Sequence, residues 1–587
     1  MITGRGATLN SMGNGTPAIA GKPSKVFLLS EEVPLSQQSA ITSFTRTITV
    51  AGGVFAPGHL GELTQYLPFE LVDDVLAQTR TMQHRLRLLP SRVGVYFVLA
   101  LGIFPGLGYE RVWDRLVSGL GALRLVRPSE KALRDLRRRI GVAPLKALFD
   151  VVAGPVARPT TPGTCYRRWR TVAFDGCSSL LAPDRPRIRA LLGKHRRGRS
   201  GVFEGYPHLR LMALCETGTR ALIGAVFGST HRGEPYYADQ LLPLLDDTML
   251  LLADRAFTGD DFLNRAADTG AQLLVRMNAR RRPAIWAVLP DGSFLTRING
   301  QTFRFIDVDI TATCADGTRI GDTYRLLTTL LDHRTDPADR LAHLYHERWE
   351  VESAFLALRH TLFTGRVLRS ADRCGLEQEL WALLTVYQVL RRAMCDAVET
   401  RPGTDPDRAC FTAALHSATD QIITATAITG PAPDNGGIMQ AVLDNLLPSR
   451  RPRISARKVK CPMSRYGVTP NEPRPLPSRN IARLDITVIP PSAHTDGPAT
   501  APDTASGRRE QVLRLLRTNP ARDFSPREIA DALQIDHVRS LSAQLGQWVP
   551  QGFLNKTGRG RYTLHPQWLA PTSSPAETAQ LTLGLTA

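Results

Sequence analysis

The chain has 587 residues, 43% of them hydrophobic, and carries a formal net charge of +19 at pH 7. It is too long for one hydrophobic core, so we expect several domains. Its apolar runs are too short to cross a bilayer, its N-terminus lacks a signal-peptide pattern, and its eight cysteines form no Cys-x-x-Cys pair. These features exclude a membrane protein, an exported protein, a zinc ribbon and a disulfide framework, and they favour a cytoplasmic location. The basic excess predicts a polyanionic partner, most often nucleic acid, the alternative being a merely basic soluble protein.

The first half of the chain passes from a helical to a mixed pattern. Residues 1–39 lack periodicity and are expected to be flexible. Residues 40–165 repeat apolar residues three and four apart, as in "LGELTQYLPFELVDDVLAQT", which predicts an all-α domain. Short β-like runs alternate with helical stretches over residues 166–270, which predicts an α/β sheet. Residues 271–335 hold alternating strands with "PDGS" and "CADGT" turns, and we interpret them as a β-rich insertion.

The second half returns to a helical pattern before the composition changes. We assign residues 336–470 to the second part of the α/β core. Residues 471–507 are rich in Pro, Ala, Thr and Ser and predict a linker. Residues 508–567 predict a last compact unit, and residues 568–587 a flexible tail. The expected fold class is an α/β core split by a β-rich insertion, with an all-α domain before it and a small domain after it.

The stretch "LYHERWEVESAFLALRH" contains a carboxylate in an apolar setting. Asp336 is expected to cap a helix that has Pro337 at its first position. If this helix continues at about 100° per residue, four polar residues share one stripe with apolar residues on both edges. These are Tyr345, Arg348, Glu352 and Arg359. A carboxylate inside an apolar face is costly unless it is paired or binds a metal. Glu352 is then either a metal ligand or the partner of Arg348 or Arg359 in a buried ion pair.

Two further acids end apolar runs. Asp175 follows "RTVAF", and Asp254 follows "TMLLLA". Acids at the carboxyl ends of strands face the crevice in which α/β proteins bind ligands. The alternatives are an Asp-Gly turn for Asp175 and a helix N-cap for Asp254. Together with Glu352 they would supply oxygen ligands for two Mg²⁺ ions that act on a phosphodiester, and Arg348 and Arg359 would then contact DNA phosphate.

The same residues carry a resemblance to a known family. Tyr345, Arg348, Glu352 and Arg359 fit the Tyr-x2-Arg-x3-Glu-x6-Lys signature of insertion-sequence-four family transposases, with Arg359 in place of the lysine. "ADRAF" resembles the family's Asp-Arg-Gly-Phe segment, and "VAFDGCS" resembles its Asp-Gly-Thr segment. "RKVKCPMSRY" resembles the basic end of its catalytic region. The similarity spans roughly residues 40–470. The sequence departs from the pattern beside both acids, at Cys177 and Ala256.

The resemblance implies a ribonuclease-H-like catalytic core with Asp175, Asp254 and Glu352 as catalytic residues and metal ligands. It implies a DDE transposase that uses Mg²⁺ or Mn²⁺, two ions in all, for cut-and-paste transposition. The partners implied are double-stranded DNA, at terminal inverted repeats and at the target, and a second copy of the chain in a homodimer. Some relatives hold a flipped base of a DNA hairpin with an aromatic residue, which makes Trp286 or Trp349 a candidate, the alternative being core packing.

The last unit reads as three helices followed by two strands, an order that resembles a winged helix-turn-helix. Ser525 and Glu528 have capping-box spacing, with Pro526 at the first helical position. The third helix would enter the major groove of DNA, while a basic turn between the strands would contact phosphate. The expected DNA contacts are Arg539, Ser540 and Gln544 on the helix and Lys556, Arg559 and Arg561 on the wing. The alternative is a protein-interaction domain.

Three functions compete at this point. The first is an active transposase that cuts at the ends of an insertion sequence and joins them to target DNA, associated with the nucleoid. The second is a catalytically inactive or domesticated transposase that regulates through DNA binding. The third is a plain metal-dependent nuclease. The presence of all three acids favours the first function over the second.

Overall fold

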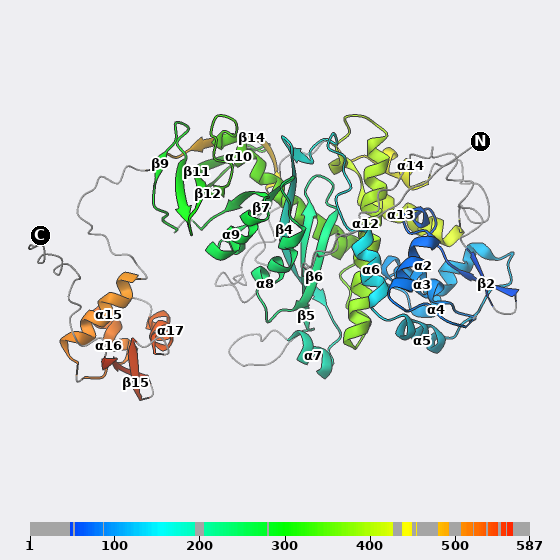
Figure 1. Cartoon of the computed structure of the whole chain (residues 1–587), viewed down its shortest axis with the longest axis horizontal. Helices are drawn as coiled ribbons and strands as arrows, with labels where there is room; N and C mark the ends of the chain where they lie inside the picture. The colour runs from blue at the N-terminus through cyan, green and yellow to red at the C-terminus, as the bar shows by residue number, and fades with distance from the viewer. Residues whose placement is uncertain are drawn as a thin grey trace, which may run out of the picture. The chain divides into compact units, whose positions relative to one another are not determined.

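The structure is a computed structural model that describes residues 47–50, 53–85, 87–193, 205–278, 281–425, 437–448, 453–454, 479–491, 506–520, 522–535, 538–549, 553–558 and 560–566. The chain divides into two compact units, Met1–Pro491 and Ser492–Ala587 (Figure 1). The two termini that we expect to be flexible lie outside the described residues. None of the described helices is long and apolar enough to cross a membrane.

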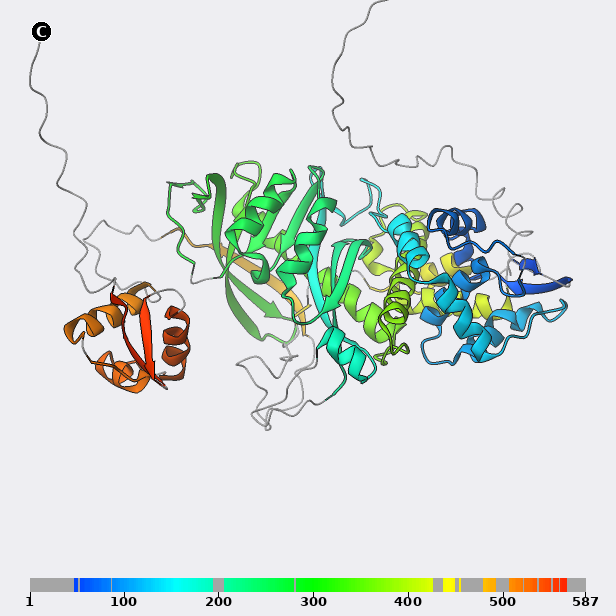
Figure 2. The ribbon, with the colours of Figure 1, turned by 60° about the horizontal axis from the view of Figure 1, so that its bottom comes forward.

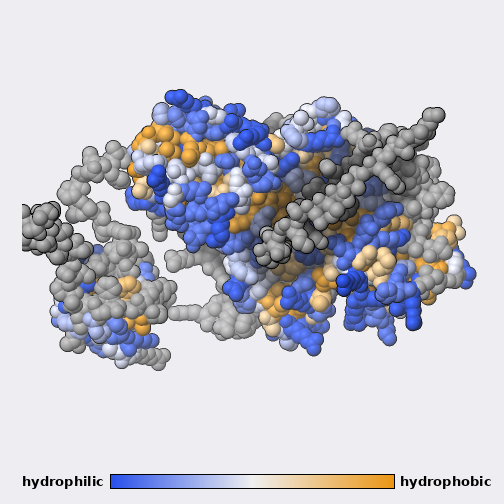
Figure 3. Space-filling view, viewed as in Figure 1, coloured by the Kyte–Doolittle hydropathy of each residue, from blue (hydrophilic) through white to orange (hydrophobic). Residues whose placement is uncertain are grey.

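The first unit begins with a small hairpin and a group of helices. Their bounds are β1 (Thr47–Val50), β2 (Val54–Pro57), α2 (Phe69–Gln78), α3 (Ser91–Ile103), α4 (Tyr109–Val117), α5 (Glu130–Ile140) and α6 (Ala143–Val152). Helix α3 is buried on nearly every side, because its sequence "SRVGVYFVLALGI" is apolar all round. Helices α4 and α5 are amphipathic, and hydrophilic residues gather over them at the lower edge of the space-filling view (Figure 3). The group is therefore built around α3.

A mixed sheet forms the centre of the unit. Its first strands are β3 (Cys165–Tyr166), β4 (Trp169–Leu181), β5 (His208–Glu216), β6 (Leu222–Ser229), β7 (Met249–Ala253) and β8 (Gln272–Arg276). Neighbouring strands follow the order β6-β5-β4-β7-β8. Strands β4, β5 and β6 pair antiparallel, whereas β4, β7 and β8 pair parallel. This mixed α/β arrangement fits the expected ribonuclease-H-like core.

The same sheet continues through the range predicted as an insertion. The added strands are β9 (Ala287–Val288), β10 (Phe294–Ile298), β11 (Gln301–Cys314), β12 (Arg319–Thr328), β13 (Arg453–Ile454) and β14 (Arg479–Val488). The predicted bounds 271–335 are wrong at their start, because the buried run of β8 pairs parallel with β7 inside the core. The predicted linker 471–507 is wrong over β14, which pairs antiparallel with β11 and packs Leu484, Ile486 and Val488 on the core.

Helices cover both faces of the sheet, and they and the first helices enclose two apolar cores. One face carries α8 (Glu234–Ala238) and α9 (Asp260–Asp268). The elements on or near the other face are α7 (Pro186–Leu192), α10 (Ala338–Tyr345), α11 (Glu350–Leu356), α12 (Arg373–Glu399), α13 (Phe411–Thr424) and α14 (Gly437–Asp444). In both ribbon views α12 stands between the strands and the first helices (Figures 1 and 2). It is buried along most of its length.

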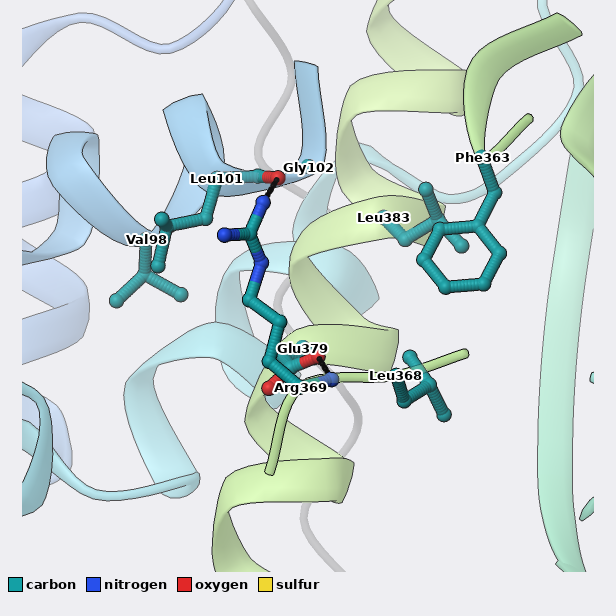
Figure 4. Close-up of a pocket in the computed structure, with 8 residues that line it drawn as sticks. All are labelled: Val98, Leu101, Gly102, Phe363, Leu368, Arg369, Glu379 and Leu383. Atoms are coloured by element: carbon teal, nitrogen blue, oxygen red, sulfur yellow. Dashed lines mark hydrogen bonds between the residues drawn. The ribbon is translucent and has the colours of Figure 1, made fainter. Parts of the chain in front are cut away.

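The contact between α3 and α12, which we name the α3–α12 seam, is closed by an arginine. The guanidinium of Arg369 donates to the carbonyl of Leu101 over 3.5 Å, and its backbone N–H donates to Glu379 over 2.8 Å (Figure 4). The cavity that remains there measures about 10 Å³, which is the space of a single water. The first helices are therefore docked tightly on the core.

The described part of the second unit contains three helices and a hairpin. Their bounds are α15 (Ser506–Thr518), α16 (Pro526–Ala532), α17 (Val538–Trp548), β15 (Leu554–Gly558) and β16 (Arg561–Leu564). The predicted capping box is confirmed, since Ser525 Oγ accepts from the Glu528 backbone N–H and the Glu528 carboxylate accepts from the Ser525 N–H over 2.7 Å. Pro526 opens the helix, as expected.

Candidate active site

The two predicted aspartates come together through the register of two parallel strands. Ala173 of β4 lies opposite Leu252 of β7, in a register that runs unbroken from Arg170. Continued for two more residues along each strand, this register would bring Asp175 opposite Asp254. Neighbouring strands lie about 5 Å apart. The sheet therefore places both carboxylates at the end of β7.

Asp175 lies inside β4 and not at its end, which corrects our expectation. It is paired with Ala213 of the antiparallel strand β5, and β4 continues as far as Leu181 because that pairing continues. The turn alternative is therefore wrong. The Asp175 carboxylate accepts from the backbone N–H of Gly176 over 2.9 Å. Burial first, and the charge of Asp175 second, raise the pKa of the Cys215 thiol, so the carboxylate acts on the face that α12 covers.

Asp254 leaves β7 in extended conformation and caps a short 3-10 helix, η6 (Arg255–Phe257). Its Oδ1 accepts from the backbone N–H of Ala256 over 2.8 Å, so the cap alternative describes its local geometry correctly. A carboxylate has about four acceptor sites, and this bond uses one of them. Capping therefore orients the carboxylate and leaves it capacity for a ligand.

The segment that follows Asp336 is not one continuous α-helix, which corrects our phase argument. Helix α10 starts at Ala338 with Pro337 at the cap position, while Asp336 binds the hydroxyl of Tyr166 over 2.8 Å. A 3-10 turn, His346–Trp349, precedes α11, and a π-helical turn, Ala357–Leu362, follows it. These turns differ from α-helix in residues per turn, so a uniform 100° step fails. Leu356, which that step placed on an apolar edge, is 60% exposed.

Tyr345 connects this segment to the strand that carries Asp254. Its hydroxyl donates to the backbone carbonyl of Ala253 over 3.1 Å. Burial raises the pKa of Tyr345, the charge of Arg348 lowers it, and the charge of Asp254 raises it, so these groups are neighbours. Arg348 is buried and Arg359 is half-exposed. The structure thus places Tyr345 and Arg348 beside the acids, in the interior of the unit.

Helix α11, which carries Glu352, packs against β4, the strand that carries Asp175. Val351 and Ala354 of this helix are buried in the core. The side chain of Glu352 lies outside the described part of the structure. In the described part, no group of three His, Cys, Asp or Glu side chains is arranged to hold a metal ion. The triad therefore stays a prediction that the backbone arrangement supports.

One acid near this site, on the other face of the sheet, was not predicted. Glu234, the first residue of α8, reaches over Gly176, so that one of its carboxylate oxygens lies 2.7 Å from where a Cβ on that glycine would stand. Burial raises the pKa of Glu234, the charge of Arg210 lowers it, and the charge of Asp254 raises it. In the sequence, "GEP" reads as an ordinary helix start with an acid in the first turn. Only the glycine that follows Asp175 hinted at a close approach.

The expected DNA contacts of the second unit are described in part. Lys556 and Arg561 are exposed on the hairpin. Arg561 donates to the Asp523 carboxylate over 3.0 Å. Gln544 on α17 is half-buried, and its Oε1 is enclosed. The remaining predicted contacts lie outside the described residues, Arg539 and Ser540 by their side chains and Arg559 entirely.

Comparisons with known proteins agree with this arrangement. The family description "Insertion element 4 transposase N-terminal" matches residues 57–150. The description "Transposase DDE domain" matches residues 179–389. The second range contains Asp254 and Glu352 and begins just after Asp175. The two matches therefore cover the first helices and most of the α/β core, in that order.

Similar proteins extend these matches. The chain is 25% identical over 427 residues to the transposase InsG for insertion sequence element IS4 of Escherichia coli strain K12, over 70% of this chain and 95% of that protein. Among solved structures, the cryo-EM structure of the piggyBac transposase synaptic complex with hairpin DNA is 12% identical, with a TM-score of 0.33 over 66% of this chain and 85% of that one. The two family matches and the long alignment with InsG show that this chain belongs to the insertion-sequence-four family of DDE transposases.

Proposed function

We propose that this DNA transposase cuts DNA at the ends of an insertion sequence and joins the freed ends to target DNA, with Asp175, Asp254 and Glu352 as its catalytic residues. The observation that carries the proposal is the parallel register of β4 and β7, whose last pair, Ala173 and Leu252, lies two residues before Asp175 and Asp254. The packing of α11 against β4 supports Glu352 as the third acid.

The three acids suit divalent cations. Carboxylate oxygens are the ligands that Mg²⁺ and Mn²⁺ prefer, and an aspartate within β4, an aspartate just after β7 and a helix glutamate would hold two ions. Such ions, when bound, stabilise the attacking and the leaving oxygens of a phosphodiester. Glu234 lies above Gly176, on the face of the sheet opposite to Asp175, so we do not count it among the ligands.

The chain's own residues keep the acids in place. The Ala256 N–H fixes the rotamer of the Asp254 carboxylate, and the Tyr345 hydroxyl fixes the backbone just before it. The buried guanidinium of Arg348 supplies positive charge near acids that would otherwise repel one another. This order matters because catalytic groups that are misplaced by about 1 Å lose about a hundredfold in rate.

The reaction has two steps in this proposal. Water attacks the phosphorus at the element end and breaks the P–O3′ bond, which leaves a 3′-hydroxyl on the element and a 5′-phosphate on the flanking DNA. The 3′-hydroxyl then attacks a target phosphodiester, and the target's own 3′-oxygen leaves. Because an element has two ends, we propose a homodimer with one acid site for each end. We propose that the transposase acts on nucleoid DNA in the cytoplasm.

The second unit has the element order of a winged helix-turn-helix, and we propose that it binds DNA through α17 and the β15–β16 hairpin. Its exposed Lys556 and Arg561 would meet phosphate. The enclosed Oε1 of Gln544 makes that residue a weaker candidate for reading bases. Removal of the unit after Gly507 tests the proposal, since DNA affinity should fall while metal-dependent cutting at high protein concentration persists.

Single substitutions of the acids test the main proposal. With Mg²⁺ and DNA that carries the element's ends, Asp175→Ala, Asp254→Ala and Glu352→Ala should each lose cutting and strand transfer to background while still binding DNA. Asp247→Ala is the matched control, because Asp247 is an exposed acid at the opposite end of β7. Cutting retained by any of the three variants would refute the assignment. Binding without any metal-dependent cutting by the unsubstituted chain would indicate a regulator.

A further inference from the structure

A cavity lined mainly by basic side chains lies on the first helices, away from the acids. It measures about 390 Å³ and opens between the loop after α2 and the last turn of α5. Its lining residues are Arg80, Thr81, Met82, Gln83, His84, Arg85, Arg87, Ser91 and Arg139. No acid is among them. We name it the arginine cavity.

The fold builds this cavity by holding the loop open. Arg80 takes a left-handed conformation, with φ 57°, directly after α2. The side chain of Ser91 donates to the carbonyl of Thr81 over 2.9 Å, and the backbone N–H of Ser91 donates to Gln83 over 2.7 Å. These bonds tie the first part of the loop to the start of α3. The basic side chains between them are thereby held along one rim.

The charges of the cavity repel one another. Burial lowers the pKa of Arg139, and the charge of Arg87 lowers it further, so the two guanidiniums are close. Arg139 donates to the carbonyl of Leu89, yet its Nε is buried and has no hydrogen-bond partner among the described residues. The nearby Asp73 binds Arg92 and does not line the cavity. Because these positive charges lie close together without a carboxylate among them, binding an anion would be electrostatically favourable.

We propose that the arginine cavity is a phosphate site that holds the backbone of DNA. Arginine suits this ligand because its planar fork matches phosphate oxygens. The volume is large enough for a nucleotide unit. The inference rests on the proposed function for the identity of the polymer. In Figures 1 and 2 the helices α2 and α3 lie across α12 from β4 and β7, so the site anchors DNA outside the catalytic acids.

Salt dependence of DNA binding tests the site. The full chain is titrated, in EDTA to prevent cutting, with a labelled duplex of about 30 base pairs at several salt concentrations. Each phosphate contact contributes about 0.9 to the slope of log K against log salt. Arg85→Ala/Arg87→Ala should lower the slope by about one to two and the affinity roughly tenfold near 0.1 M salt. Both arginines are exposed, so the fold is retained.

The matched control removes two arginines elsewhere. Arg111→Ala/Arg134→Ala changes the net charge equally, but these exposed residues already pair with Asp114 and Glu130 at 3.6 and 3.4 Å. If the two double variants have the same DNA affinity and the same slope of log K against log salt, the proposal of a phosphate site is wrong. Arg139→Lys keeps the positive charge but loses the planar guanidinium. Its DNA affinity should lie between those of wild type and Arg85→Ala/Arg87→Ala.

Two further measurements separate the competing explanations. ATP is titrated alone against wild type and Arg85→Ala/Arg87→Ala; tight ATP binding lost in the variant, with DNA affinity unchanged, would assign the cavity to a free nucleotide and overturn the proposal. Asp254→Ala should bind DNA with the wild-type slope. If wild type cuts DNA but Arg85→Ala/Arg87→Ala binds DNA as well as Arg111→Ala/Arg134→Ala does, the cavity proposal is wrong and the proposed function stands. If the slope falls as expected but wild type does not cut, the proposed function fails alone.

Discussion

The α3–α12 seam and the arginine cavity use the same side chain for opposite purposes. Beside the seam, Arg137 of α5 is buried, donates to Gln378 of α12 over 2.8 Å and lies 3.4 Å from the carboxylate of Glu379, which also accepts from the N–H of Arg369. In the cavity, the arginines line open space and have no acid among them. The seam satisfies its charges within the fold, whereas the cavity leaves them for a ligand.

The difference shows how a highly basic chain divides its arginines. A buried guanidinium without partners costs several kcal/mol, so the seam needs its glutamate for stability. An exposed guanidinium beside a like charge costs little, so a cavity can hold several of them ready for an anion. Net charge alone, which first suggested a polyanionic partner, cannot separate the two kinds of arginine. Substitutions can.

The largest effect on stability is expected from Glu379→Ala. The change leaves Arg137 buried without its carboxylate and the N–H of Arg369 without its acceptor. Removing one partner of a buried pair costs about 3–5 kcal/mol. Urea denaturation should show a lower midpoint for the transition of the first unit. Glu377→Ala is the control, because Glu377 pairs with exposed Arg373 on the same helix and should cost about 0.5 kcal/mol or less. Equal losses for both variants would contradict the distinction.

A smaller effect on stability is expected from Arg139→Ala. Arg139 both forms a hydrogen bond within the fold and lines the arginine cavity. The change removes the donor to the Leu89 carbonyl, at a cost of about 1 kcal/mol, and relieves the repulsion with Arg87, which offsets part of that cost. The same denaturation experiment should place this variant well above Glu379→Ala in stability. A loss as large as that of Glu379→Ala would make Arg139 a structural residue and weaken the case for the cavity.

The candidate site shows what the sequence could and could not provide. Asp175 and Asp254 could be found because each ends a run of apolar residues that predicts a strand. The continuation of β4 past Asp175 depends on β5, a partner about 40 residues away, and local pattern does not report it. Apolar periodicity also does not report the 3-10 and π turns around α11, because these turns change the residues per turn over only 4 and 6 residues.

Other features were hidden because their parts are distant in the chain. Glu234 meets Gly176 only after α8 folds back on the sheet. Arg139 joins the loop after α2 only when α5 packs beside α3. The strand β14 looked like linker because its neighbours are rich in Pro, Ala, Thr and Ser, although its own alternating apolar residues allowed pairing with β11. The architecture was thus predictable where a feature depends on the pattern of one continuous segment. It was less predictable where a feature depends on contact between two segments that are distant in the chain.

An exposed acid in the second unit provides a third case, in which hydrogen bonds from the capping box act together with an ion pair to Arg522. The backbone N–H of Ser525 first, and then its side chain and Arg522, lower the pKa of Glu528 to about 2. Because the folded pKa is below the usual 4.5, this stabilisation is present above about pH 4.5 and is lost as the pH falls toward 2. Wild type should therefore have a higher melting temperature than Glu528→Gln at pH 6, and the difference between the two melting temperatures should vanish near pH 2. A gap independent of pH would refute the link to this carboxylate.

The smallest effect on stability, and the most informative about the cavity, is expected from Arg87→Ala. Arg87 is exposed, and its charge opposes that of Arg139, so its removal should leave the free energy of unfolding within about 0.5 kcal/mol or raise it slightly. The same variant should weaken DNA binding and lower its salt slope by about one. Because a structural arginine cannot be removed without loss of stability, unchanged stability together with weaker binding separates a ligand site from a structural one. A drop in stability comparable to that of Glu379→Ala would show that the cavity arginines hold the fold together, as those of the α3–α12 seam do.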